Sequence, residues 1–302
     1  MDAADRGRRD ATGPLVRVDA PDDPRLDLYR DLNEPAARHR TEADQAIFMV
    51  EGRLAVDRLL TSGYPIRSLL VDERQVVPAR DLVAATRSRG APVFVGSRAV
   101  VAATVGFALH RGVVAVASRP APVDPGRLLD GAMERAVAAG VPPLLAVLEG
   151  LNDHENIGAL FRNAAAFGVA GALLDPTCAD PLYRRSVRVS VGHVLHVPFS
   201  RLLPWPAGLD QVRAAGFLVA ALAPRPAAGA GRTVSLAELR GRTAGPGHPT
   251  GVALLLGAEG PGLTEAALTV SDVVVSIPMA DGVDSLNVAT AAAVAFHAFT
   301  AA

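Results

Sequence analysis

Five polar side chains, Asn152 to Asn156, separate an apolar run from an alanine-rich segment in "LEGLNDHENIGALFRNAAAFGV". A strand-to-helix connection needs one capping residue and one turn residue, so most of this cluster exceeds what folding requires. On a helix, Arg162 lies about 140° from Ile157, off the apolar face, where it can face a site or solvent. His154 between two acids suggests a metal, but adjacent residues point in different directions, so we expect no metal site.

A second polar cluster is "LLLGAEGPGLT", where an apolar strand runs into Gly257, Gly260 and Gly262 around Glu259. Glycines let the backbone approach a ligand closely or adopt positive φ. Their order is not the dinucleotide fingerprint, and a chain without lysine has no Walker lysine. A ligand loop and a plain tight turn are both compatible with this pattern.

The third cluster is "IPMADGVDSLNVATAAAVAFHAF", from Ile277. Ser285 is the predicted N-cap of a last helix that starts near Leu286, and Asn287 falls in its first turn, where it can reach outward. Capping explains Ser285. It does not explain Asn287 together with the acids Asp281 and Asp284.

Alternating strands and helices are predicted for residues 141–302, with apolar strands at "LLAVLEG", "GALLD", "LHVPF", "FLVAAL", "GVALLLG" and "VVVSIPM". Strands that are apolar throughout indicate a parallel sheet covered on both faces. Ligands of such sheets bind beyond the carboxyl ends of the strands, where the three polar clusters fall. The fold class is therefore α/β.

A smaller αβ domain is predicted for residues 15–119, with strands at "AIFMV", "RSLLVD", "PVFVG" and "HRGVVAVAS" and helices at "EGRLAVDRLLTSG" and "ARDLVAATRSRG". Residues 1–14 are expected to be a disordered tail. The proline-rich segment "RPAPVDPG" marks a linker, 120–140, which includes a short helix from Arg127 to Ala139.

Composition limits the possible functions. Half of the 302 residues are hydrophobic, yet no apolar run is long enough for a membrane span and the N-terminus lacks a secretory signal, so we expect a cytoplasmic protein. Cys178 is the only cysteine, which excludes a disulfide framework within the chain. Net charge is -1, but residues 24–120 carry 14 arginines against 10 acids and residues 121–302 carry 12 against 15.

An arginine-rich stretch with an interleaved aromatic lies between the first and second clusters: Tyr183, Arg184, Arg185 and Arg188. Such a patch suits phosphate contact and base stacking. The alternative is a solvated arginine face. His193 and His196 are expected to be packed strand residues.

Taken in order, the clusters match three motifs: N-x-x-x-N-x-G-x-x-x-R-x-A-x-x-F-G, L-G-x-E-G-x-G-L, and I-P-M followed by S-L-N-V. This pattern resembles the SpoU/TrmH branch of the SPOUT RNA methyltransferases. Residues 15–119 resemble that family's ribosomal-protein-like RNA-binding domain through "IFMVEGRLAVDRLL" and "HRGVVAV". The resemblance covers the chain from about Leu15 to its end.

The resemblance implies a C-terminal SPOUT methyltransferase domain with a trefoil knot and a parallel sheet, acting as a homodimer. It implies that S-adenosylmethionine binds at the knot and that a ribose 2′-hydroxyl of RNA receives the methyl group. The cofactor-binding residues would be Leu256, Gly257, Glu259, Gly260, Gly262, Ile277, Met279, Leu286 and Asn287.

The catalytic residues implied by the resemblance are Asn156, Arg162, Glu259, Ser285 and Asn287. Arg162 would be the base, although a guanidinium normally stays protonated, or a fixed cation that stabilises the developing alkoxide. Ribosomal RNA is the expected substrate because of the extra N-terminal domain. The alternatives are a transfer-RNA or base-directed methyltransferase of the same superfamily, and a non-catalytic RNA-binding protein that retains the knot.

Overall fold

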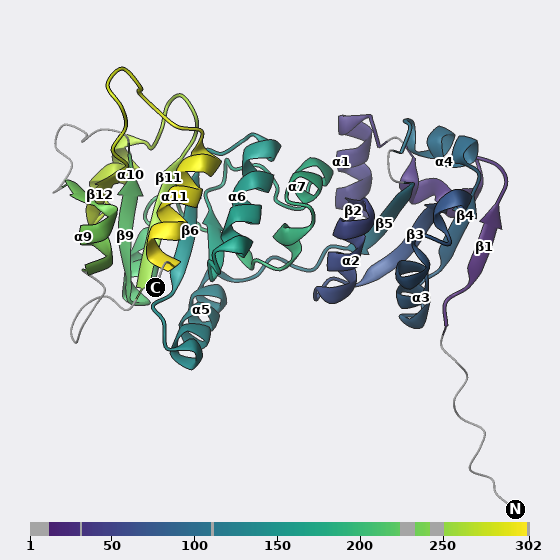
Figure 1. The fold of residues 1–302 in the computed structure, drawn as a ribbon, viewed down its shortest axis with the longest axis horizontal. Coiled ribbons are helices and arrows are strands. Elements are labelled where there is room, and N and C mark those ends of the chain that lie inside the picture. Colours follow the sequence, from purple (N-terminus) through teal and green to yellow (C-terminus); the bar gives the residue numbers. More distant parts are fainter. Residues whose placement is uncertain (1–11, 31, 110–111, 224–232, 242–250, 301–302) are drawn as a thin grey trace, which may run out of the picture. The chain divides into compact units, whose positions relative to one another are not determined.

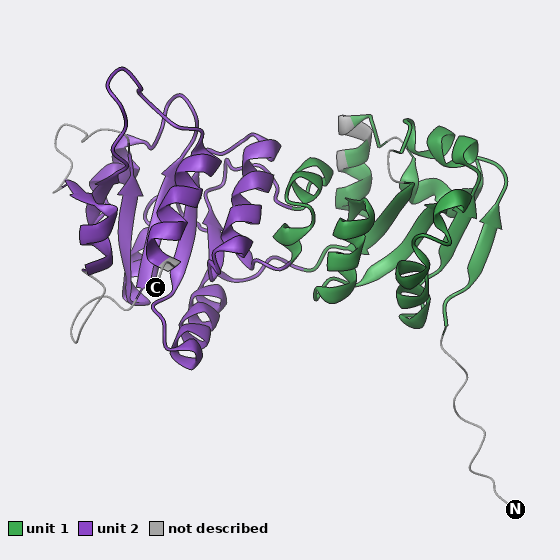
Figure 2. Ribbon diagram, viewed as in Figure 1, with its two compact units in different colours: residues 1–120, 182–195 green, residues 121–181, 196–302 purple. Residues whose placement is uncertain are grey.

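The computed structural model describes residues 12–300, apart from 31, 110–111, 224–232 and 242–250. The predicted tail, 1–14, lies outside the described residues except for its last three. The chain forms two compact units (Figure 2): unit 1 comprises residues 1–120 and 182–195, and unit 2 comprises residues 121–181 and 196–302. Unit 1 therefore contains a segment from the second half of the sequence.

Unit 1 contains a mixed five-stranded sheet in the order β1-β4-β3-β5-β2. In chain order its strands are β1 (Leu15–Val18), β2 (Ile47–Glu51), β3 (Ile66–Asp72), β4 (Val93–Gly96) and β5 (Val113–Ser118). The α-helices of residues 12–120 are α1 (Pro35–Asp44), α2 (Arg53–Thr61), α3 (Arg80–Ser88) and α4 (Arg98–Val105), with 3-10 helices η1 (Pro24–Tyr29) and η2 (Glu73–Gln75). The predicted strands and helices are confirmed, whereas β1, α1 and α4 were not predicted.

Residues 182–195 add α7 (Arg184–Val189) and the 3-10 helix η3 (His193–Leu195) to unit 1. Gly192 has a φ of +84°, and a Cβ there would lie 2.8 Å from the Cα of Ala55 on α2. The Arg58 guanidinium, also on α2, donates to the Val191 carbonyl at 2.7 Å. Only glycine permits this close approach, so the segment packs directly on α2.

Unit 2 contains a seven-stranded sheet in the order β10-β12-β9-β11-β6-β7-β8. Every pairing in it is parallel, which confirms the predicted parallel sheet. The strands are β6 (Leu144–Glu149), β7 (Gly171–Leu174), β8 (Phe199–Arg201), β9 (Phe217–Leu222), β10 (Thr233–Ser235), β11 (Gly251–Gly257) and β12 (Val273–Ser276). The trefoil knot stays a prediction.

The α-helices of unit 2 are α5 (Pro125–Ala139), α6 (His154–Ala166), α8 (Leu209–Ala214), α9 (Leu236–Gly241), α10 (Glu265–Thr269) and α11 (Val288–Thr300). Figure 1 shows α6 and α11 side by side. The strand predicted at "LHVPF" is wrong in its bounds, since η3 takes its first residue and β8 begins at Phe199. The short elements β10, α9 and α10 were not predicted.

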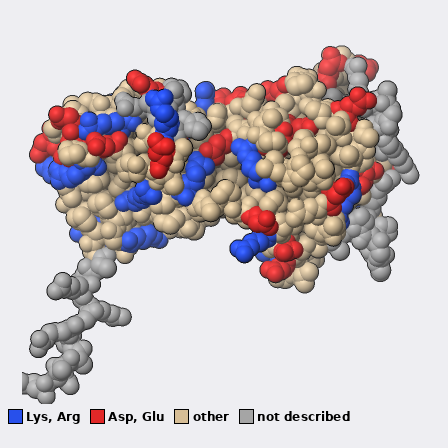
Figure 3. All heavy atoms as spheres, turned by 180° about the vertical axis from the view of Figure 1, so that it is seen from behind, with Lys and Arg blue, Asp and Glu red and all other residues tan. Residues whose placement is uncertain are grey.

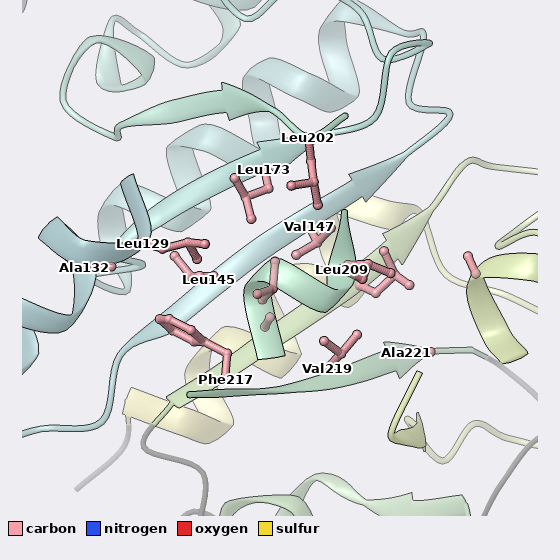
Figure 4. Packing of buried hydrophobic residues seen from close by; sticks show 14 of the residues in the cluster. Leu129, Ala132, Leu145, Val147, Leu173, Leu202, Leu209, Phe217, Val219 and Ala221 are labelled. Atoms are coloured by element: carbon pink, nitrogen blue, oxygen red, sulfur yellow. The ribbon is translucent and has the colours of Figure 1, made fainter. Parts of the chain in front are cut away.

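One buried cluster of unit 2 lies between a face of its sheet and the helices α5 and α8 (Figure 4). Leu129 of α5 and Leu209 of α8 pack with Leu145 and Val147 of β6 and with Val219 of β9. Leu129 and Leu209 are fully buried. On α5 the apolar residues recur at helical spacing, which places them on the one face that packs on the sheet. Because neighbouring strands are parallel, β9, β11 and β12 end at one edge of this sheet, which positions the loops that follow them.

No helix in the described part of the chain combines the length and apolar character that crossing a membrane requires.

Candidate active site

A cavity of about 410 Å³ opens in unit 2 beyond the carboxyl ends of β9, β11 and β12. All nine residues predicted to bind a cofactor line it: Leu256, Gly257, Glu259, Gly260, Gly262, Ile277, Met279, Leu286 and Asn287. Ser285 lines it as well. The lining residues that the sequence did not indicate are Leu222, Ala223, Ala258, Leu263, Val288 and Ala291.

Two of the missed lining residues, Leu222 and Ala223, lie outside the three sequence clusters. Leu222 and Ala223 end or follow β9, an apolar strand with no polar cluster after it in the sequence. Their place in the cavity follows from the pairing of β9 with both β11 and β12. A sequence pattern gives strands but not their order, so this wall of the cavity depends on the sheet topology.

The loop between β11 and α10, residues 257–264, closes tightly on itself. A Cβ on Gly257 would lie 2.5 Å from both the carbonyl carbon of Gly262 and the nitrogen of Leu263. The Gly262 amide donates to the Ala258 carbonyl at 3.0 Å, and Gly260 and Gly262 have φ of +86° and +71°. The glycines therefore build a compact backbone wall on the cavity, which we call the glycine loop.

Asn287 connects the three sequence clusters. Its side-chain nitrogen donates to Oδ1 of Asn156 at 2.8 Å and to the carboxylate of Glu259. Its Oδ1 accepts from the backbone nitrogens of Ala289 at 3.0 Å and Thr290 at 3.2 Å. Asn287 thus caps α11 and joins α6 to the glycine loop.

The prediction that Ser285 caps the last helix is wrong. The helix α11 begins at Val288, and the cap is Asn287, which stands directly before the apolar run. Serine and asparagine are equally good N-caps, so residue type did not distinguish them. Ser285 is exposed and lies in the irregular segment that precedes the helix.

The helix α6 positions the residues of the first cluster. Asp153 caps it by accepting from the Glu155 amide at 2.7 Å, and the predicted apolar face, including Ile157 and Phe161, is buried. Asn163 donates to the Ala289 carbonyl at 2.8 Å, which ties α6 to the start of α11.

The structure brings together three of the five predicted catalytic residues, Asn156, Glu259 and Asn287. Ser285 shares the cavity wall with Glu259 and Asn287. Arg162 is exposed on α6 and lies outside the set of described residues that line the cavity. Arg162 lies six positions after Asn156 on the helix, which turns their side chains about 120° apart.

The predicted RNA-binding residues lie in unit 1, on or beside α7. The Arg184 guanidinium stacks over the Phe107 ring at 4.6 Å and lies 3.4 Å from the Glu51 carboxylate. Burial, together with the nearby Arg38 charge, lowers the pKa of Arg184. Arg38 in turn stacks over the Tyr183 ring at 5.2 Å, whereas Arg185 and Arg188 are exposed.

Cys178 is a buried residue without nucleophilic character. Burial, reinforced by the Asp175 carboxylate, raises the pKa of its thiol to about 12. The thiol is therefore protonated at neutral pH and donates to the Leu148 carbonyl at 3.3 Å.

Two family models match the chain. The SpoU rRNA methylase family model matches residues 143–297, and the model for RNA 2′-O ribose methyltransferase substrate binding matches residues 49–123. The chain belongs to the SpoU rRNA methylase family. As a SpoU protein it is an RNA methyltransferase, which confirms the family resemblance of its three motifs.

Relatives of this SpoU protein cover nearly its whole length. An uncharacterized tRNA/rRNA methyltransferase of Mycobacterium tuberculosis is 44% identical over 92% of this chain and 88% of its own. An AdoMet-bound rRNA methyltransferase from Sinorhizobium meliloti is 26% identical, with a TM-score of 0.72 over 95% of this chain and 97% of its own.

The SpoU methyltransferase AviRb from Streptomyces viridochromogenes, solved in complex with AdoMet, is 24% identical to this chain. Its TM-score is 0.73 over 92% of this chain and 98% of its own. At that identity the comparison shows a shared fold.

We predict that Asn287→Ala lowers the free energy of unfolding by about 1 kcal/mol, because α11 loses its N-cap. Asn287→Ser keeps an oxygen that can accept from the first turn, so it should retain most of the stability. It cannot reach both Asn156 and Glu259. Denaturant unfolding of the two variants measures the difference; equal losses would contradict the capping role and assign the stability to the bridge between α6 and the glycine loop.

Proposed function

We propose that this SpoU methyltransferase transfers a methyl group from S-adenosylmethionine to a ribose 2′-hydroxyl of structured RNA, namely ribosomal RNA. The observation that carries the proposal is that all nine residues expected to bind the cofactor line the same cavity. The substrate-binding family model at residues 49–123 carries the description of 2′-O ribose methylation.

The cavity fits S-adenosylmethionine. Its volume, about 410 Å³, is in the range of small-molecule sites, and its lining combines apolar side chains with a few polar groups. The Gly262–Leu263 peptide leaves no room for a Cβ on Gly257. The glycines of this loop therefore present backbone groups, and not side chains, to a ligand in the cavity. Leu256, Ile277 and Leu286 would contact the apolar parts of the cofactor, and its sulfonium would supply the electrophilic methyl group.

The residues around the cavity suit a reaction in which a sugar hydroxyl loses its proton as it attacks. Asn156, Glu259 and Asn287 form a hydrogen-bonded set, contributed by α6, the glycine loop and the start of α11, that would orient the ribose. Arg162 is proposed either as the base or as a fixed cation beside the developing alkoxide. As an exposed residue outside the cavity lining, it would act at the rim, on RNA that has bound there.

RNA capture is assigned to unit 1. Arg185 and Arg188 are exposed on α7 and would contact RNA phosphates. Arg188 also lies 3.9 Å from the Glu51 carboxylate, whereas Arg184 is half-buried, lies 3.4 Å from Glu51 and stacks on Phe107. Transfer RNA is the alternative substrate, and a non-catalytic RNA-binding protein is the alternative of a different class. Mapping of ribose methylation in RNA from cells with and without this chain distinguishes the three. A mark lost from ribosomal RNA supports the proposal, a mark lost only from transfer RNA contradicts it, and no lost mark in either RNA favours the non-catalytic alternative.

Location and assembly belong to the same proposal. We propose that the protein works in the cytoplasm. We also propose that it is a homodimer, because the family resemblance implies that both chains contribute to each site. The apolar helix α11 exposes Val294, which is 42% accessible and which we place in the dimer contact.

We predict that Gly257→Ala weakens S-adenosylmethionine binding at least tenfold, because the added methyl group displaces the Gly262–Leu263 peptide 2.5 Å away. Gly241→Ala, at the end of α9, is the control and should bind like the wild type: Gly241 lies outside the described residues that line the cavity, and nothing lies within 4 Å of its Cβ. Calorimetric titration of both variants and the wild type measures the affinities. Wild-type protein that binds neither the cofactor nor its demethylated product would exclude the enzymatic proposal.

We predict that Arg162→Ala reduces methyl transfer roughly a hundredfold or more, the scale of losing a general base or one electrostatic donor, with cofactor affinity near normal. Arg162→Lys should rescue poorly because an ammonium cannot replace a forked, planar donor. Single-turnover transfer to the cognate RNA is measured beside cofactor binding. Turnover within a few-fold of the wild type for both variants would reduce Arg162 to a solvated helix residue.

We predict that the protein has twice the mass of one chain in light scattering, and that Val294→Arg shifts it toward the monomer. The charged side chain would be desolvated in an interface but is tolerated on an exposed surface. Thermal unfolding of the variant is the control for folding. A wild-type monomer at working concentration would contradict the dimer.

A further inference from the structure

Glu149 is a buried carboxylate beside the cavity that none of the three motifs contains. It ends β6, where it pairs in register with Gly257 of β11, and it is 4% exposed. A buried carboxylate is costly unless it is fully hydrogen-bonded, so its partners show which parts of the chain it holds.

Three donors converge on Glu149 from two distant segments. The indole nitrogen of Trp205 and the hydroxyl of Thr264 donate to Oε1, each at 2.7 Å. The Thr264 backbone nitrogen donates to Oε2 at 2.8 Å. Hydrogen bonds to a charged acceptor are about twice as strong as neutral ones, so this set fixes Thr264 firmly to the end of β6.

Thr264 is the last residue of the glycine loop and the N-cap of α10. Its hydroxyl accepts from the Ala267 amide at 3.2 Å while it donates to Glu149. The preceding residue, Leu263, lines the cavity. The loop is thus held at its first end by β11 and at its last end by Glu149.

We propose that Glu149 is a positioning residue for the cofactor site: through Thr264 it holds the glycine loop in the conformation that binds S-adenosylmethionine. The proposal rests on the proposed function of the cavity. Glu149 lies outside the described residues that line the cavity, so it acts through Thr264 and not by contact with the ligand.

Trp205 provides a direct readout of this set. It is the only tryptophan of the chain, so intrinsic fluorescence reports on the indole that donates to Glu149 and on no other. Amide hydrogen exchange at Thr264 reports on the bond from the Thr264 backbone nitrogen to Glu149. Both measurements use the cofactor-free protein and do not depend on activity.

The test compares four variants of the full chain by calorimetric titration with S-adenosylmethionine. Glu149→Gln replaces one acceptor oxygen by an amino group and should weaken binding about tenfold or more, with faster exchange of the Thr264 amide. Thr264→Val loses only the hydroxyl and should fall in between, whereas Thr264→Ser keeps both donors and should bind like the wild type. Trp205→Phe leaves both Thr264 bonds and should bind within about threefold.

The outcomes separate the two proposals. Wild-type protein that does not bind S-adenosylmethionine would overturn the proposed function and this inference with it. Wild-type binding together with unchanged affinity in folded Glu149→Gln and Thr264→Val would overturn this inference alone and leave Glu149 a purely structural residue. If Glu149→Gln does not fold, Thr264→Val against Thr264→Ser decides: equal affinities contradict the positioning role.

Discussion

The side-chain amide of Asn287 is the interaction on which the site depends. Its oxygen is committed to two backbone amides at the start of α11, so its nitrogen faces Asn156 and Glu259. A carboxamide has distinct donor and acceptor ends, and capping the helix therefore also fixes which end the site receives. One residue joins clusters that lie 131 positions apart in the chain.

The cavity owes its shape to supports on both ends of the glycine loop. At one end the loop is so close-packed that Gly257 cannot carry a side chain, and at the other Glu149 holds Thr264. Both Gly257 and Glu149 end central strands of the parallel sheet, where they pair in register with each other. A site formed in this way before the ligand arrives avoids the cost of ordering the loop on binding.

Unit 1 shows that an arginine-rich sequence is not the same as a basic surface. Arg38 is 3% exposed, donates to Glu42 and covers Tyr183, and Arg184 lies between Phe107 and Glu51. On the face drawn in Figure 3 the two signs of charge are intermixed. Part of the arginine excess in residues 24–120 therefore lies in the interior of unit 1. The exposed arginines Arg185 and Arg188 of α7 add positive charge to the surface of unit 1 from a later part of the sequence.

The sequence by itself determined the α/β class, most strands, the buried face of α6 and the wall of the cavity made by the second and third clusters. These follow from local pattern, because apolar runs, helical spacing and glycines at a strand end each carry their meaning within a few residues. It did not determine that Asn287, and not Ser285, caps the last helix, because both residue types are good N-caps. The packing of α11 against α6 selects the residue at which the helix starts.

Tertiary structure alone decided three further features. The order of the strands brings Leu222 to the cavity, the packing of Gly192 on Ala55 assigns residues 182–195 to unit 1, and the meeting of Trp205 and Thr264 makes Glu149 a support of the glycine loop. Each depends on contacts between residues far apart in the chain. Such contacts are selected by the total burial and hydrogen bonding of the folded unit, which no short stretch of sequence contains.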